Sequence, residues 1–165
     1  MLINAPLERR ARVLYSRASL TPRGLIPMLP IPGKNCGSCT MCCKVLEIEH
    51  FSKPAGDWCR HCNHAGGCHI YLERPEVCRE FECEWMLDRK MAPLLRPDRV
   101  GTILMEDADS NEFRAVCDPA KPMAWLNPHV FKYLVALAKS GRIVVAKAGL
   151  KAWRIHASGE YGPVA

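Results

Sequence analysis

Residues 36–43 read Cys36-Gly37-Ser38-Cys39-Thr40-Met41-Cys42-Cys43, a C-x2-C-x2-C-C pattern that places four thiols within eight positions. The chain has ten cysteines, and five more follow before residue 84: Cys59, Cys62, Cys68, Cys78 and Cys83. A stretch so rich in thiols is usually a disulfide framework in a secreted domain and a set of metal ligands in a cytosolic one.

The spacing of the thiols favours metal ligands. A disulfide needs Cα atoms about 4.4–6.8 Å apart with facing Cβ atoms, so the neighbours Cys42 and Cys43 could pair only through a strained ring. A C-x2-C turn instead directs two thiolates at one ion, about 2.3 Å from each sulfur. We therefore expect metal binding, with disulfides and inert core cysteines as the alternatives.

The rest of the composition is that of a soluble globular protein. The chain has 165 residues, of which 48% are hydrophobic and 24% charged, so it can bury an ordinary core. It has no apolar run of about 18 residues, as a membrane span requires, and its first residues lack the pattern of a secretory signal. We expect a cytoplasmic protein with no membrane contact, in a reducing compartment that again favours ligated thiolates.

The formal net charge is +6, and it is concentrated before the cysteines. Residues 1–35 carry six Lys or Arg side chains and one acidic residue, Glu8. We interpret residues 1–32 as a basic, Pro-rich arm that is solvated; contact with nucleic acid through this arm is an alternative that we do not favour. A protein partner is expected.

The sequence predicts an α+β protein in two modules, a cysteine-rich metal-binding module over residues 33–91 and a smaller α+β module over residues 92–165. In the first, one helix is expected from Pro75 to about residue 90, with Val77, Phe81 and Trp85 on its buried face. In the second, the pattern predicts a β-β-α-β-β run forming a small antiparallel sheet, with strands at 100–105, 112–117, 142–148 and 152–156 and a helix opening at Asn127-Pro128 and ending at Gly141.

The number of thiols predicts two metal centres or one binuclear centre. Neighbouring residues such as Cys42 and Cys43 rarely reach one ion without backbone strain, and nine thiols exceed one tetrahedral site. Two C-x2-C turns, Cys36/Cys39 and Cys59/Cys62, could together form a zinc site. The C-x2-C-x2-C loop also resembles those that hold iron–sulfur clusters with a remote fourth ligand. Zinc is narrowly preferred, and iron or an iron–sulfur cluster is the alternative.

Several other side chains near the thiols are candidate ligands or supporting groups. Cys78 and Cys83 are about 140° apart on an unbroken helix, so either the helix frays near Cys83 or the two thiols serve separate sites. Arg74 and Arg79 could donate to a thiolate or pair with nearby glutamates. Cys117 is expected to be a core residue. The histidines are expected to be surface or hydrogen-bonding groups more than ligands: His50, His61, His64 and His69.

Taken together, residues 33–87 resemble the YkgJ-type cysteine-cluster family, described as zinc- or iron-chelating domains. The resemblance rests on the C-x2-C-x2-C-C loop, on Gly67-Cys68-His69-Ile70-Tyr71, and on Arg74-Pro75-x2-Cys78-Arg79-x-Phe81-x-Cys83. It implies eight ligand positions and leaves Cys62 as an extra thiol; the eight are Cys36, Cys39, Cys42, Cys43, Cys59, Cys68, Cys78 and Cys83. Related clusters in flagellin lysine methylases imply an iron–sulfur cluster there.

These observations leave three classes of function open. The metal could be structural in a scaffold for partner contact, it could be buffered or delivered, or it could belong to an iron–sulfur redox or accessory enzyme that assists a protein modification such as methylation. The sequence contains no G-x-S-x-G, H-E-x-x-H or phosphate-binding Gly-rich motif, so nothing in it supports a hydrolase. No catalytic residue is assigned, and whether the protein is an enzyme stays open.

Overall fold

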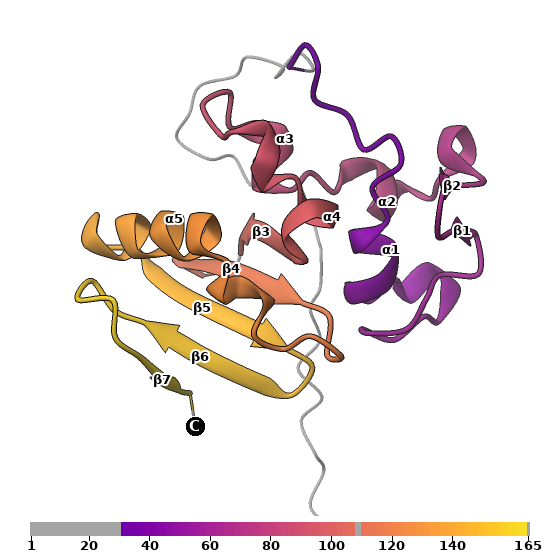
Figure 1. Cartoon of the computed structure of the whole chain (residues 1–165). Helices are drawn as coiled ribbons and strands as arrows, with labels where there is room; N and C mark the ends of the chain where they lie inside the picture. The colour runs from indigo at the N-terminus through magenta and orange to yellow at the C-terminus, as the bar shows by residue number, and fades with distance from the viewer. Residues whose placement is uncertain (1–30, 108–109, 165) are drawn as a thin grey trace, which may run out of the picture.

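A computed structural model describes residues 31–107 and 110–164, so almost all of the arm assigned to residues 1–32 lies outside the described part. The described chain is a mixed helix and strand protein with one sheet of two strands and one of five. The cysteine-rich half forms short elements on one side, and the larger sheet forms the other (Figure 1). The expected mixture of α and β structure is thus confirmed.

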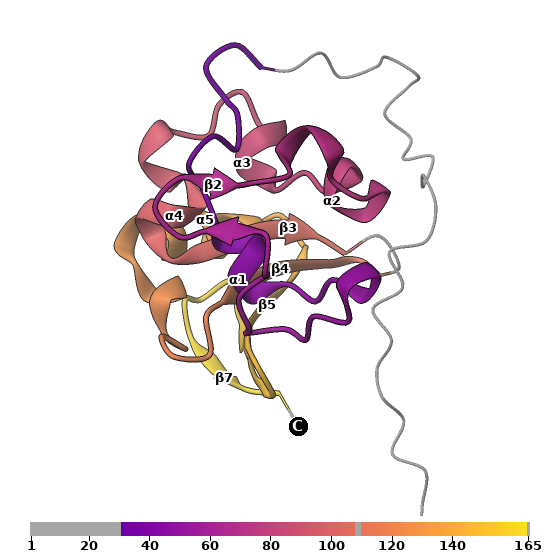
Figure 2. The ribbon, with the colours of Figure 1, turned by 90° about the vertical axis from the view of Figure 1, so that its right-hand side faces the viewer.

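The cysteine-rich half is built from short helices and one small hairpin. Its many turn-forming residues and scattered apolar residues do not support long helices or strands. Figure 2 looks directly onto this half, with the first helix, the hairpin and the second helix in front of the large sheet. The elements are α1 (Met41–Val45), the hairpin strands β1 (Cys62–Asn63) and β2 (Gly67–Cys68), α2 (Glu76–Glu80), α3 (Glu84–Leu87) and α4 (Pro97–Val100).

The prediction of a single helix from Pro75 to about residue 90 is wrong. Helix α2 ends at Glu80, and Phe81 and Cys83 are extended, with ψ angles of 118° and 159°, before α3 begins at Glu84. The break changes the direction of the chain between Cys78 and Cys83. In an unbroken helix these two side chains would point to different sides of the helix. The expected stripe of apolar side chains therefore does not exist as one helical face, although Trp85 is buried.

The large sheet has the strand order β3-β4-β5-β6-β7. The strand between α4 and the acidic turn begins two residues later than expected, because Val100 ends α4. The last strand was not expected, since a three-residue Tyr-Gly-Pro segment carries no alternating pattern. The strands are β3 (Thr102–Glu106), β4 (Glu112–Cys117), β5 (Ile143–Ala148), β6 (Lys151–Ile155) and β7 (Tyr161–Pro163).

The expectation of an antiparallel β-β-α-β-β sheet is corrected by the pairing of β4 with β5, which is parallel, in register from Glu112 opposite Ile143 to Val116 opposite Lys147. The other pairs are antiparallel. Between β4 and β5 the chain passes through a 3-10 turn, Ala124–Leu126, and the long helix α5 (Pro128–Lys139). Such a crossover returns the chain to the end of the sheet where it started, so the next strand runs parallel.

Helix α5 covers one face of the five-stranded sheet (Figure 1). It begins as the sequence predicts: the side chain of Asn127 accepts from the backbone N–H of His129 at 3.1 Å, and Pro128 occupies the first turn. Val130 and Leu134 are 0% exposed against the sheet. Gly141 follows the helix with φ +88°, a conformation that favours glycine.

The apolar core runs without interruption from the sheet into the cysteine-rich half. Val45 of α1 and Trp85 of α3 belong to the same buried cluster as Ile103 and Leu134. The indole N–H of Trp85 donates to the carbonyl of Ala92 at 3.2 Å, across the expected boundary near residue 92. The division into two modules remains a prediction.

Within residues 31–107 and 110–164, no helix combines the length and apolar character that a membrane crossing needs.

Candidate metal centre

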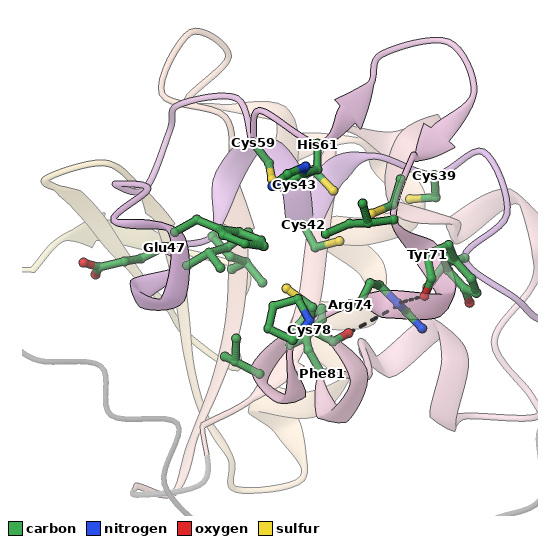
Figure 3. A pocket seen from close by; sticks show the side chains of 18 of the residues that line it. Cys39, Cys42, Cys43, Glu47, Cys59, His61, Tyr71, Arg74, Cys78 and Phe81 are labelled. Atoms are coloured by element: carbon green, nitrogen blue, oxygen red, sulfur yellow. Dashed lines mark hydrogen bonds between the residues drawn. The ribbon is translucent and has the colours of Figure 1, made fainter.

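Seven of the eight candidate ligand cysteines line one cavity of about 60 Å³. They come from five segments: the loop before α1, α1 itself, the turn at residue 59, β2 and α2. Figure 3 shows Cys43 and Cys59 on one side of this cavity, Cys78 on the opposite side and Cys42 between them. We call it the larger cavity; its cysteines are Cys36, Cys39, Cys42, Cys43, Cys59, Cys68 and Cys78.

The eighth candidate, Cys83, lines a smaller cavity of about 40 Å³. The two cavities share four cysteines: Cys36, Cys39, Cys42 and Cys78. The structure therefore brings all eight candidates to the walls of two adjoining cavities. Cys62 lines neither of them, and Cys117 is buried in the sheet, with its sulfur 3.3 Å from the hydroxyl oxygen of Thr102. This arrangement does not favour a zinc site formed by the Cys36/Cys39 and Cys59/Cys62 turns, because Cys62 lies outside both cavities.

We call residues 36–43 the ligand loop, because four candidate ligands lie in it, and backbone hydrogen bonds hold this loop in place. The N–H of Cys39 donates to the carbonyl of Cys36 at 2.7 Å, closing the C-x2-C turn, and helix α1 starts two residues later. The N–H of Cys59 donates to the carbonyl of Cys43 at 2.9 Å, which ties the later turn to the end of the first motif. Two segments separated by 15 residues thus present their thiols from one backbone framework.

Gly67 lets the hairpin approach the ligand loop closely. It is buried and has φ +101°, and a Cβ atom placed on it would lie 2.6 Å from the carbonyl oxygen of Gly37. Backbone contacts this close leave room only for hydrogen, and the positive φ is a second reason for glycine. The next residue, Cys68, is a candidate ligand, so this contact sets the distance between Cys68 and the Cys36–Cys39 turn.

We expect Gly67→Ala to displace Cys68 from the ligand loop and to lower metal content sharply. The backbone conformation alone should cost about 1–3 kcal/mol for a residue with a Cβ, and the clash with the Gly37 carbonyl adds to this. Gly66→Ala is the matched control, because Gly66 is exposed and its added Cβ would meet only the flexible side chain of Asn63. Metal content and thermal unfolding of both variants test this; equal losses would contradict it.

Burial shapes the proton equilibria of the thiols. It raises the pKa of Cys36, Cys39 and Cys78, and it raises the pKa of Cys83 to about 12. The pKa of Cys42 is raised well above its ordinary value, first by hydrogen bonding with the Cys43 thiol and then by burial. Without a metal ion these five thiols are therefore neutral at pH 7, and a coordinating metal ion is one agent that deprotonates such groups.

Arg74 is a charged side chain at the junction of the two cavities. It lines both cavities, and its guanidinium lies 3.7 Å from the centre of the Tyr71 ring. Its Nε donates to the carbonyl of Tyr71 at 2.8 Å, and its charge acts to lower the pKa of Cys36 and of Cys78 against the effect of burial. Arg79, the other candidate from the sequence to donate to a thiolate, is exposed and lines neither cavity.

Two further cations were missed by the sequence reasoning. Arg96 lines the smaller cavity and donates from Nη2 to the carbonyl of Cys36 at 3.2 Å and to the hydroxyl of Ser38 at 3.0 Å. Lys53 is only 6% exposed, and its Nζ donates to the carbonyls of Leu46 and Pro54 beyond the end of α1. Burial lowers the pKa of Lys53. Arg96 contacts residues about 60 positions away, and Lys53 lies in an irregular turn. No local sequence pattern predicts either kind of contact.

Of the four histidines that lie among the cysteines in the sequence, His61 lines the larger cavity, and its ring centre lies 4.8 Å from that of Phe51. The other three are exposed. His64 stacks on Trp58 at 3.9 Å, and His50 meets Phe51 edge-on at 4.9 Å. For these three, the structure agrees with the interpretation as surface groups.

The donor set fits a soft metal, because sulfur ligands surround both cavities. In the part of the chain that the structure describes, however, no group of three or more His, Cys, Asp or Glu side chains is already arranged so that it could hold a metal ion. The backbone therefore gathers the thiols around shared cavities, and side-chain rotation would have to complete any coordination shell.

Comparisons with known proteins add no relative. No protein-family model matches the chain, and neither a curated protein nor a solved structure is similar to it. The resemblance to the YkgJ-type family therefore remains an expectation from the cysteine spacing.

Proposed function

We propose that the protein is a metal-binding cysteine-cluster protein that holds zinc through thiolates in two adjoining centres, with a structural or metal-handling role. The observation that carries the proposal is the gathering of all eight candidate cysteines on the walls of two cavities that share four of them. The ligands would be Cys36, Cys39, Cys42, Cys43, Cys59, Cys68, Cys78 and Cys83. These eight positions are the ones that the resemblance to the YkgJ-type family implies.

The cavity walls suggest how the ligands divide. Cys43, Cys59 and Cys68 line only the larger cavity, so we assign them to one centre. Cys83 lines only the smaller cavity and belongs to the other. The four shared thiols would complete both shells or bridge them. This division also explains the neighbours Cys42 and Cys43, because one of the pair faces both cavities and the other faces only one.

The nearby cations suit such an anionic centre. Eight thiolates around two divalent ions would leave a net charge of about −4, which is costly to bury without compensating groups. Arg74 stands beside Cys36 and Cys78, and Arg96 holds the backbone of the Cys36–Cys39 turn. We propose that Arg74 orients and stabilises the thiolates by charge and hydrogen bonding, as residues around metal ligands commonly do.

An iron–sulfur centre is the alternative, with a redox or accessory role in a protein modification such as methylation. It is favoured by the apolar side chains that line the larger cavity beside the thiols, because limited solvent access tunes and protects such clusters. These side chains include Ile48, Phe51, Ile70, Val77 and Phe81. Reduced thiolate ligands of either kind suit a reducing compartment, so we propose a cytoplasmic location, and a scaffold role implies a protein partner.

The test is anaerobic purification of the full chain followed by elemental analysis, sulfide assay and visible absorption. We expect about two zinc ions per chain and a colourless solution, since all-thiolate sites hold zinc without absorbing visible light. Iron with inorganic sulfide in a brown solution would select the alternative. A metal-free protein whose cysteines form four or more disulfides by mass spectrometry would contradict both.

A further inference from the structure

Cys62 is the thiol of the 36–83 stretch that the proposed ligand set leaves out. It is half-buried and lies in β1, and it stands directly opposite Cys68 of β2 in an antiparallel register. Cys68 is one of the proposed ligands and lines the larger cavity. A spare thiol therefore faces a ligand thiol across a two-stranded hairpin.

The hairpin brings the two residues into the range of a disulfide. One step outward from the pair, the N–H of His69 donates to the carbonyl of His61 at 2.9 Å. Opposite residues of an antiparallel ladder alternate between hydrogen-bonded and non-hydrogen-bonded pairs, so Cys62 and Cys68 form a non-hydrogen-bonded pair with Cα atoms about 4.5 Å apart. Side chains of such a pair project from the same face, and a disulfide spans Cα separations of about 4.4–6.8 Å.

Two other thiols lie near Cys62. Burial raises the pKa of Cys62, and a hydrogen bond with Cys43 opposes part of that rise. Cys59 precedes it in a C-x2-C turn closed by a backbone hydrogen bond of 3.0 Å. Cys68 differs from both because it faces Cys62 in the ladder itself, and the contact of Gly67 with Gly37 holds that strand against the ligand loop.

We propose that Cys62 is a redox-active thiol that forms a disulfide with Cys68 on reaction with a small disulfide such as oxidised glutathione. The Cys62 thiolate attacks one sulfur of oxidised glutathione, which forms a mixed disulfide and releases one glutathione thiolate. The Cys68 thiolate then attacks the Cys62 sulfur and releases the second. Two electrons pass from the cysteines to oxidised glutathione. The proton lost by Cys62 ends on one released glutathione, and the other takes its proton from solvent, because Cys68 as a ligand is already a thiolate.

The consequence for the metal centre rests on the proposed function. A Cys68 sulfur engaged in a disulfide is no longer a thiolate ligand, so the larger cavity loses one of the three cysteines that it does not share with the smaller one. Cys62 would thus make metal retention sensitive to the thiol–disulfide balance around the protein.

Trypsin can identify the partner of Cys62. The metal-loaded full chain is treated with substoichiometric oxidised glutathione, alkylated and digested. Cys62, Cys68 and Cys78 lie together in peptide 61–79, since the Arg74-Pro75 bond resists trypsin, whereas Cys43 and Cys59 lie in peptides 35–44 and 45–60. The expected product is peptide 61–79 with an internal disulfide and an alkylated Cys78.

Cys62→Ser should abolish this product, and Cys117→Ser should leave it unchanged. A peptide 61–79 joined to either other peptide, or a fully alkylated Cys62, would overturn the proposal. In parallel, a chromogenic chelator should detect metal released from the oxidised protein and none from Cys62→Ser; disulfide formation without release from loaded protein would overturn the link to metal retention. The same disulfide in a protein that contains no metal would support the pairing and contradict the proposed function instead.

Discussion

Removal of the proposed metal under reducing conditions should speed amide hydrogen exchange throughout residues 33–85 while α5, β4 and β5 keep most of their protection. Between residues 33 and 85 the buried apolar side chains are few, too few to offset the entropy of ordering that segment: Val45, Ile48, Cys59, Cys83 and Trp85. A structural zinc ion contributes about 10–16 kcal/mol in small zinc domains at neutral pH. We therefore expect exchange there to accelerate by orders of magnitude.

The sheet should respond differently because it has its own core. Phe113, Val130, Leu134, Val144 and Ile155 are all at most 1% exposed, and none is a proposed ligand. The measurement is hydrogen exchange by mass spectrometry before and after chelation, with re-addition of zinc as the control for reversibility. If β4 and α5 lose protection in step with residues 33–85, the chain is one cooperative unit and the expected division near residue 92 is wrong.

Replacement of a thiol that lines both cavities should cost more metal than replacement of one that lines a single cavity. We expect Cys78→Ser to bind less than about one ion per chain, because serine is a poor zinc ligand and both tetrahedral shells depend on shared thiols. Cys83→Ser should retain about one of two ions, since Cys83 lines only the smaller cavity. The measurement is elemental analysis of the purified variants.

Cys117→Ser is the control for these variants. Cys117 is 1% exposed within the sheet, and a serine hydroxyl there can keep the hydrogen bond to Thr102. It should bind as much metal as the unaltered protein. Cys62→Ser should also retain its metal, because Cys62 lines neither cavity. Equal losses in Cys78→Ser and Cys83→Ser would contradict the division of ligands between two centres.

Local patterns predicted the parts of the fold that depend on local chemistry. The Asn127-Pro128 start and the Gly141 end of α5 follow from capping, and the alternation in residues 112–117 predicted β4 with its observed bounds. The parallel pairing of β4 with β5 depends on which way a 25-residue connection returns, which no local pattern encodes. The break after Glu80 was missed for a similar reason, since helical periodicity continues through Phe81 although the backbone does not.

The candidate site divides in the same way. The resemblance to the YkgJ-type family implied the eight thiols that line the cavities, whereas spacing alone also nominated Cys62, which lines neither. The supporting cations were not found: Arg96 reaches Cys36 across 60 positions, and Lys53 is a lysine whose burial is unusual for its type. Gly67 belongs to the motif in the sequence, but only the folded chain shows its close approach to Gly37.

Strand β3 shows what else the cysteine-rich half does for the molecule. It is an edge strand of the five-stranded sheet, yet Thr102–Met105 are all buried, with α1, α3 and α4 packed against it. Exposed apolar edges are templates for pairing between chains. The opposite edge, β7, is short and ends in Pro163, which limits such pairing there. A cysteine-rich half that loosened on metal loss would uncover β3 and expose the demetallated chain to strand pairing and aggregation.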